Sequence, residues 1–169
     1  MHLKEHITYG GAVSIALFPV FGIRVLFFFL GSVFIDLDHY IDFLYYSRFK
    51  KWSIKSMFAL HNKMSEWKDK ENICALEAFH TIEFLLALLA VAFYFHSREL
   101  FLLFSGMLFH LTLDMIRLRQ WGKGKIFIRA FSFIEYWIRA QKMKRLGTHP
   151  EKIYFEAYAE SCQNRSGAK

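Results

Sequence analysis

The stretch Val25–Asp42 reads VLFFFLGSVFIDLDHYID. A long apolar run passes here directly into four ionisable residues, Asp36, Asp38, His39 and Asp42. Ionisable side chains are costly to place inside a bilayer, and where an apolar span carries them they are usually functional. The stretch therefore predicts a membrane helix that contributes to a polar site.

The composition of the whole chain favours the same interpretation. Hydrophobic residues make up 54% of the 169 residues and aromatic residues 19%, more apolar surface than a soluble domain of this size hides easily. The net charge of +7 is compatible with nucleic-acid binding. However, the Lys and Arg residues cluster between apolar segments, as in the cytoplasmic loops of membrane proteins. We therefore expect membrane lipids as partners and no nucleic acid.

Four apolar segments are candidates for membrane helices, because a span needs ~20 mostly apolar residues. They are Leu3–Phe18, which is short for a full span, Ile23–Tyr46, Ile73–His96 and Leu100–Leu118. The stretch Ser47–Asn72 and the segment after Leu118 are rich in Lys and Arg, whereas the two opposite turns offer only Arg24 and Arg98. The apolar segments predict an all-α, polytopic membrane bundle over residues 1–121. The positive-inside rule then predicts that both termini lie in the cytoplasm.

Residues 122–169 are predicted to form cytoplasmic amphipathic helices and a tail. Lys125–Arg145 has apolar residues at helical spacing together with several Lys and Arg residues. Such a basic amphipathic helix either lies in the membrane interface or packs as an ordinary helix on the bundle, and both interpretations stay open. Gly147 ends this helix, and Thr148 with Glu151 has the spacing of a capping box that starts a last short helix.

Ionisable residues recur in all four apolar segments. They are His6 in the first, Asp36, Asp38 and His39 in the second, His80 and Glu83 in the third, and His110 and Asp114 in the fourth. In each of the last three segments, a histidine and a carboxylate stand three or four residues apart and share one side of the helix. Counted at ~1.5 Å per residue from the external turns, these residues lie roughly 18 to 27 Å deep. Four antiparallel helices would bring them to one level near the cytoplasmic face.

This set of side chains predicts a metal site. Neutral imidazole with carboxylate suits Zn, Mn or Fe, with Mg less favoured, and no cysteine takes part as in a structural zinc site. The predicted ligands of one or two divalent ions are His6, Asp36, His39, His80, His110 and Asp114. Two metals can activate water and hold a phosphoester. A carboxylate outside the ligand set, Glu83 or Asp38, would then accept the proton of that water.

Other ionisable residues have simpler interpretations. A lone histidine in an apolar helix, such as His96, is more often hydrogen-bonded packing than a ligand. Asp42 and Glu77 lie near predicted helix ends, where they either join the site or face headgroup water. His61 and His149 lie in polar stretches, and we expect them to be solvated.

The order of four motifs resembles the inner-membrane-associated metal-dependent hydrolases of the YdjM type. The motifs are HITYG at His6–Gly10, DLDH at Asp36–His39, AFHTIE around His80, and HLTLD at His110–Asp114. The resemblance covers roughly residues 1–118 and implies a bacterial inner-membrane protein with a metal-dependent hydrolase site. The chain departs from the family's pattern at Ile35, where the family often has Pro, and at Thr81, where Ser is usual.

Three functions are open at this point. The first is a membrane-embedded metal-dependent hydrolase that acts on a phosphoester or another amphiphilic, lipid-like substrate. The second is a haem-binding or metal-transporting membrane protein, because paired histidines on neighbouring helices can ligate haem; haem does not, however, require a carboxylate one turn from each histidine. The third is a non-catalytic membrane interaction protein.

Overall fold

The chain divides into two compact, mostly helical units in a computed structural model that describes residues 3–66, 74–120, 129–148, 152 and 155–159. The first unit comprises Met1–Asp36 and Ala78–Ile126, and the second comprises Leu37–Glu77 and Phe127–Lys169. Each unit thus joins two segments that are distant in sequence. The predicted all-α fold class is confirmed, with two short strands as the only β structure among the described residues.

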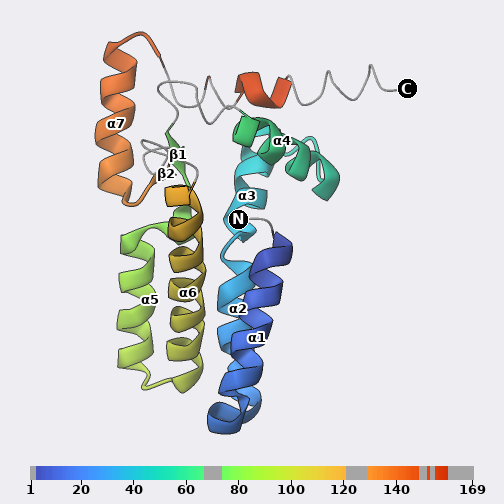
Figure 1. The fold of residues 1–169 in the computed structure, drawn as a ribbon. Coiled ribbons are helices and arrows are strands. Elements are labelled where there is room, and N and C mark those ends of the chain that lie inside the picture. The colour runs from blue at the N-terminus through green and yellow to red at the C-terminus, as the bar shows by residue number, and fades with distance from the viewer. Residues whose placement is uncertain (1–2, 67–73, 121–128, 149–151, 153–154, 160–169) are drawn as a thin grey trace. The chain divides into compact units, whose positions relative to one another are not determined.

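The first unit consists of two helical hairpins (Figure 1). Its elements are α1 (Leu3–Phe21), η1 (Gly22–Arg24), α2 (Val25–Phe34), η3 (Ala78–His80), α5 (Ile82–Tyr94) and α6 (Arg98–Gln120). The chain reverses at Gly22, whose φ of 57° is a left-handed conformation that glycine adopts without strain. Arg24 in this turn pairs with Glu99 at the start of α6 (Nε–Oε1 2.8 Å), so the two turns meet.

Glycines let the helices of the first unit approach closely. A side chain at Gly106 of α6 would overlap the backbone of Phe28 and Ser32 in α2, and one at Gly31 would overlap the backbone of Leu103. Small residues at such crossings are typical of helices that associate in membranes, because packing rather than hydrophobic burial holds them together. The close crossing of α2 and α6 places the α2 backbone beside the middle of α6.

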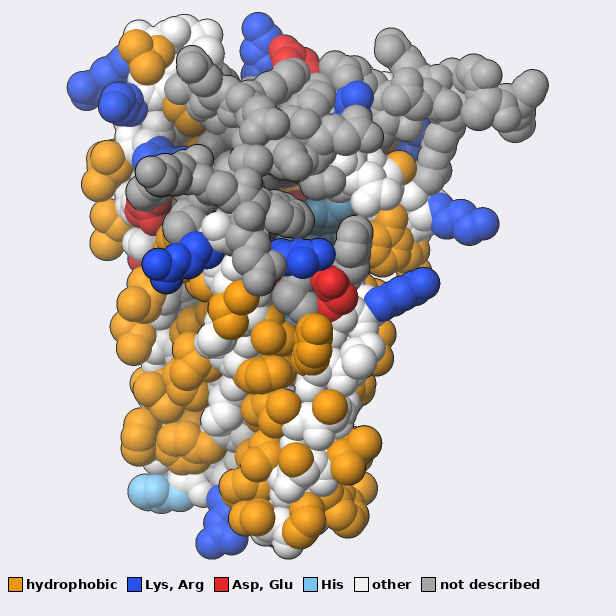
Figure 2. Space-filling model, in the orientation of Figure 1, with side chains coloured by type: hydrophobic (Ala, Val, Ile, Leu, Met, Phe, Trp, Pro, Cys, Tyr) orange, Lys and Arg blue, Asp and Glu red, His pale blue; other side chains and the backbone are white. Residues whose placement is uncertain are grey.

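Among the described residues, two helical stretches are long and apolar enough to cross a membrane, Leu3–Tyr45 with 43 residues and Arg98–Arg117 with 20. The first contains the reversal at Gly22, so α1 and α2 are separate segments of it. Helix α5 is apolar but has 13 residues, or about 20 Å, against a hydrocarbon core of ~30 Å. Hydrophobic side chains gather on the face of these helices that Figure 2 shows, and many large ones, such as Ile15, Phe18 and Leu86, are exposed. Four spans stay a prediction.

Two predicted helices are interrupted. The second, expected to be continuous over Ile23–Tyr46, has a turn at Ile35–Asp36 between α2 and α3. The third, expected over Ile73–His96, becomes α-helical only at Ile82, because Thr81 is extended and its hydroxyl accepts a hydrogen bond from the Phe84 N–H (3.4 Å). Threonine in this position satisfies a backbone donor at a helix start, and it therefore sets the boundary.

The second unit contains the helices α3 (Leu37–Tyr46), α4 (Ile54–Glu66) and α7 (Phe133–Arg145) and the strands β1 (Ala75–Leu76) and β2 (Arg129–Ala130). The strands pair in parallel, with Ala75 opposite Arg129 and Leu76 opposite Ala130. One small core gathers Phe43, Leu44, Leu60 and Ala157. A second core gathers Cys74, Ala130 and Met143 beside the strands.

Helix α7 begins later than predicted. It starts at Phe133 rather than Lys125, because Ser132 caps it: the Ser132 hydroxyl accepts hydrogen bonds from the Ile134 and Glu135 N–H groups (3.1 and 3.4 Å). Glu135 in turn accepts a hydrogen bond from the Phe131 N–H (2.9 Å). This reciprocal pattern resembles a capping box. The capping residue Glu151 of the predicted last helix lies outside the described residues, although residues 155–159 are helical.

Candidate metal centre

Five of the predicted ligands come together in the first unit. His6 lies in the first turns of α1, Asp36 follows α2, and His80 is the last residue of η3. His110 and Asp114 stand four residues apart on α6 and so share one face. The three histidines are almost completely buried.

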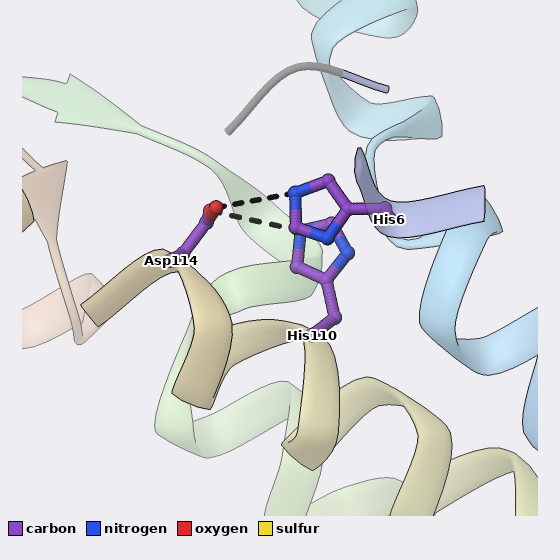
Figure 3. A group of neighbouring side chains, drawn as sticks. All are labelled: His6, His110 and Asp114. Atoms are coloured by element: carbon purple, nitrogen blue, oxygen red, sulfur yellow. Dashed lines mark ion pairs between the residues drawn. The ribbon is translucent and has the colours of Figure 1, made fainter. Parts of the chain in front are cut away.

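His6, His110 and Asp114 form the first group of possible metal ligands (Figure 3). The His6 and His110 rings stack with centroids 3.6 Å apart and an interplanar angle of 11°. Asp114 faces both rings: its Oδ1 lies 3.3 Å from His6 Nε2, and its Oδ2 lies 3.6 Å from His110 Nε2. One ligand atom from each residue lies within 4.8 Å of the others, close enough for a single ion to contact all three.

Asp36, His80 and His110 form the second group, again with ligand atoms within 4.8 Å of one another. Asp36 Oδ1 lies 3.3 Å from His110 Nε2 and 3.6 Å from His80 Nε2. The His80 and His110 rings meet edge to face, with centroids 5.4 Å apart. The two groups therefore share His110, whose Nε2 lies near a carboxylate of each.

The hydrogen bond of His110 Nδ1 fixes the orientation of the ring and therefore the direction in which Nε2 points. His110 Nδ1 lies 2.9 Å from the backbone carbonyl oxygen of Ser32. A carbonyl oxygen can only accept, so Nδ1 must carry the proton, and in neutral imidazole Nε2 then has the free lone pair. Metal-binding histidines are typically oriented by such a hydrogen bond to a carbonyl or carboxylate. Gly31 and Gly106 permit the helix crossing that places the Ser32 carbonyl there.

The surroundings of His6 also fit a cation. Among the described residues, neither ring nitrogen of His6 makes a hydrogen bond, although the ring is 1% exposed and its Nε2 faces the Asp114 carboxylate at 3.3 Å. Buried polar groups nearly always have a partner. A lone pair that faces a carboxylate is electrostatically unfavourable unless a proton or a metal ion lies between them. Three imidazoles and two carboxylates are a donor set that binds divalent transition metals, so these buried clusters could hold a metal ion.

The predicted ligand His39 and the predicted base Asp38 belong to the second unit. His39 Nδ1 lies 3.5 Å from both Asp38 Oδ1 and Glu77 Oε1. His61, expected to be solvated, is half-buried, with its ring centroid 4.1 Å from that of His39. Glu77 is also buried and pairs with Arg129 of β2. His61 was not predicted to be buried because the stretch Ser47–Asn72 was interpreted only as a charged loop. The structure forms the helix α4 within that stretch, and His61 lies on it.

Glu83 does not share a helix face with His80 as predicted, because His80 precedes the helix cap Thr81 and Glu83 follows it. Glu83 is half-buried in the first turn of α5, where a carboxylate interacts favourably with the helix dipole. It belongs to neither of the two ligand groups. Its role as a general base stays a prediction, as does that of Asp38.

Sequence reasoning did not identify Ser32 as part of the site. Its signal was the pair Gly31–Ser32 inside a run of large apolar residues, since a small residue there marks a close approach of another backbone. The carbonyl that holds His110 belongs to the backbone, and no residue type could have revealed it.

No known protein family, curated protein or solved structure matches the chain. The resemblance to the YdjM-type hydrolases therefore stays a prediction.

Proposed function

We propose that the chain is a membrane-embedded, metal-dependent hydrolase that acts on a phosphoester or lipid-like substrate. The observation that carries this proposal is that two groups of possible metal ligands share His110. The Nδ1 of His110 donates a hydrogen bond to the Ser32 carbonyl oxygen, which leaves Nε2 to face both groups. This hydrogen bond fixes the orientation of the imidazole ring, so the ring is preorganised to bind a cation. The metal ligands of the first unit are then His6, Asp36, His80, His110 and Asp114.

The chemistry of the donors favours Zn, Mn or Fe over Mg. Imidazole suits the first three, whereas Mg²⁺ is usually held by oxygen ligands and keeps several waters. His110 Nε2 can bind only one metal, although both ligand groups include His110. The five residues would therefore hold either one ion or two ions of which only one contacts His110.

A divalent metal at this position would supply positive charge that activates water and stabilises the charge developing on a phosphoester. The residues of the chain contribute burial and orientation. Burial of His6, His80 and His110 excludes bulk water and strengthens electrostatic interactions inside the site. Glu83, a carboxylate of the first unit outside the ligand groups, would accept the proton of the attacking water.

The membrane-crossing length of Leu3–Tyr45 and Arg98–Arg117 supports an amphiphilic substrate. His6, Asp36, His110 and Asp114 lie in or just beside these stretches, so a lipid would reach them more directly than a water-soluble molecule. We further propose four spans in a bacterial inner membrane, with both termini cytoplasmic, from the distribution of Lys and Arg.

A haem site is less consistent with the geometry. Two axial histidines of a haem lie on opposite sides of the porphyrin, whereas the His6 and His110 rings stack directly at 3.6 Å. If the chain is instead a non-catalytic membrane interaction protein, it would bind metal but hydrolyse no substrate.

The test is metal analysis of the purified full-length chain in detergent, followed by hydrolysis assays with a chromogenic phosphodiester and with phospholipid. We expect bound Zn, Mn or Fe, and we expect H110A and D114A to lose metal and activity together. His96 is exposed in the turn between α5 and α6 and has a positive φ of 47°, so H96N, which tolerates that conformation, is the matched control and should retain both.

Three outcomes would contradict parts of this proposal. A wild-type chain that binds none of these metals would overturn the metal site. Bound metal without hydrolysis of any phosphoester would overturn the activity but keep the site. A Soret band in the visible spectrum would favour haem instead.

A further inference from the structure

The exposed face of α7 is apolar where a helix in water would be polar. Ile134, Trp137 and Ile138 are 67%, 64% and 56% exposed. Ile134 and Ile138 are four residues apart and lie on one side of the helix, with Trp137 beside them. Three large apolar side chains in one patch mark an interaction surface, whereas single exposed ones do not.

The opposite face of α7 is already packed. Met143 is buried with Cys74 and Ala130 of the second unit, and Tyr136 packs against the same cluster. Arg139, at the side of the helix, pairs with Glu135 (Nη1–Oε1 3.0 Å). The exposed patch is therefore a second face of a helix whose core-facing side is satisfied.

Cations occupy the same helix next to the apolar patch. Lys142, Lys144 and Arg145 lie in its last turn, and all three are exposed. Figure 2 shows cationic side chains beside hydrophobic ones along this helix. The exposed apolar patch and the three neighbouring cations together would complement a partner with an apolar interior beneath an anionic surface.

A bilayer with anionic headgroups has this chemistry. Apolar side chains of an amphipathic helix enter the boundary between headgroups and acyl chains, while Lys and Arg contact the phosphates. The segment from Arg117, the last residue of the α6 stretch that is long and apolar enough to cross a membrane, to Phe133 reaches at most roughly 55 Å when extended. The covalent link thus keeps α7 near a membrane surface at high effective concentration.

Other partners fit less well. A nucleic acid would contact the three cations but leave Ile134 and Ile138 in water. A protein partner would cover the apolar patch without a need for three cations at its end, since charged residues are depleted in the core of protein interfaces.

We infer that the outer face of α7 binds the anionic membrane surface, with Ile134, Trp137 and Ile138 in the acyl boundary and the last-turn cations on lipid phosphates. This inference does not depend on the metal site, and each can fail without the other. It also selects the interfacial placement of this helix over simple packing on a bundle.

The experiment places an environment-sensitive fluorophore at I138C in the full-length chain. The chain carries C162S as well, and burial raises the pKa of the remaining Cys74 thiol, which slows its labelling. The same chain without I138C reports any label on Cys74. The protein is reconstituted in nanodiscs of phosphatidylcholine, alone or mixed with phosphatidylglycerol, and the label is quenched by nitroxide lipids or by aqueous iodide.

We expect quenching by nitroxide lipid and protection from iodide in the anionic nanodiscs. The triple variant K142Q/K144Q/R145Q should reverse this pattern, with the ratio of lipid-side to water-side label at least tenfold lower, since each cation contributes roughly fivefold. The charge-conserving control K142R/K144R/R145K should behave like wild type, which shows that the loss of charge is responsible.

Two outcomes would overturn the inference. One is full iodide access to the label in both kinds of nanodisc, which means that the face stays in water. The other is protection from both quenchers in every lipid, which means that protein covers the face. Unchanged metal content in the triple variant is expected in each case and confirms that the first unit is intact.

Discussion

Replacement of Gly106 by alanine should separate α2 from α6 and thereby weaken metal binding without touching a ligand. The added Cβ would lie 2.9 Å from both the Phe28 carbonyl carbon and the Ser32 nitrogen, and nearer still to the Phe28 oxygen. Carbon atoms pack best at about 3.5–4.0 Å, so the backbones must separate by roughly 1 Å. Backbone atoms cannot rotate away as the end of a side chain could.

Separation of α2 from α6 would also break the hydrogen bond that orients His110. His110 Nδ1 now lies 2.9 Å from the Ser32 carbonyl oxygen. A separation of roughly 1 Å would lengthen this contact beyond the range of a hydrogen bond. Loss of such an orienting partner typically weakens metal binding about 10–100-fold, and overpacking costs about 1–3 kcal/mol of stability.

The assay is metal titration and thermal unfolding of the purified chain in detergent. G11A is the matched control, because a Cβ at Gly11 would meet only the Phe29 ring at 3.9 Å, an ordinary contact. We expect G11A to resemble wild type and G106A to show weaker metal binding and a lower Tm. A G106A chain with unchanged metal affinity would refute the role of the Ser32 carbonyl, and one with unchanged Tm would refute the close packing.

Two further predictions test other parts of the molecule. E83Q keeps the shape of the side chain but removes the proton acceptor, so it should retain most of the bound metal and lose on the order of 100-fold or more in hydrolysis rate; loss of metal would instead identify Glu83 as a ligand, and unchanged rate would exclude it as the base. S132A removes the hydroxyl that caps α7 and should cost about 1 kcal/mol of stability, with faster amide exchange at Ile134 and Glu135, whereas S132T should retain the cap; unchanged exchange in S132A would contradict the capping role.

The helical fold was predictable because its signals are local. Apolar runs such as Val25–Phe34 and Ile82–Tyr94 favour helices whatever packs around them. The four-residue spacing of His110 and Asp114 likewise depends only on the geometry of α6. Boundaries were less predictable: Thr81 and Ser132 each start a helix later than the apolar pattern suggested, because one capping hydrogen bond outweighs the pattern at that point.

The sequence by itself determined that ionisable side chains would lie within apolar helices, and it identified the residue types that suit a metal. Only the tertiary structure decided which of them meet. The stacking of His6 on His110, and the contact of Asp36 with both His80 and His110, join residues far apart in the chain. Such contacts depend on where helices cross, and glycines at positions 31 and 106 permit the crossing of α2 and α6. The Ser32 carbonyl that orients His110 is a backbone group that every residue has, so the pair Gly31–Ser32 marks a close approach of another backbone but not this contact.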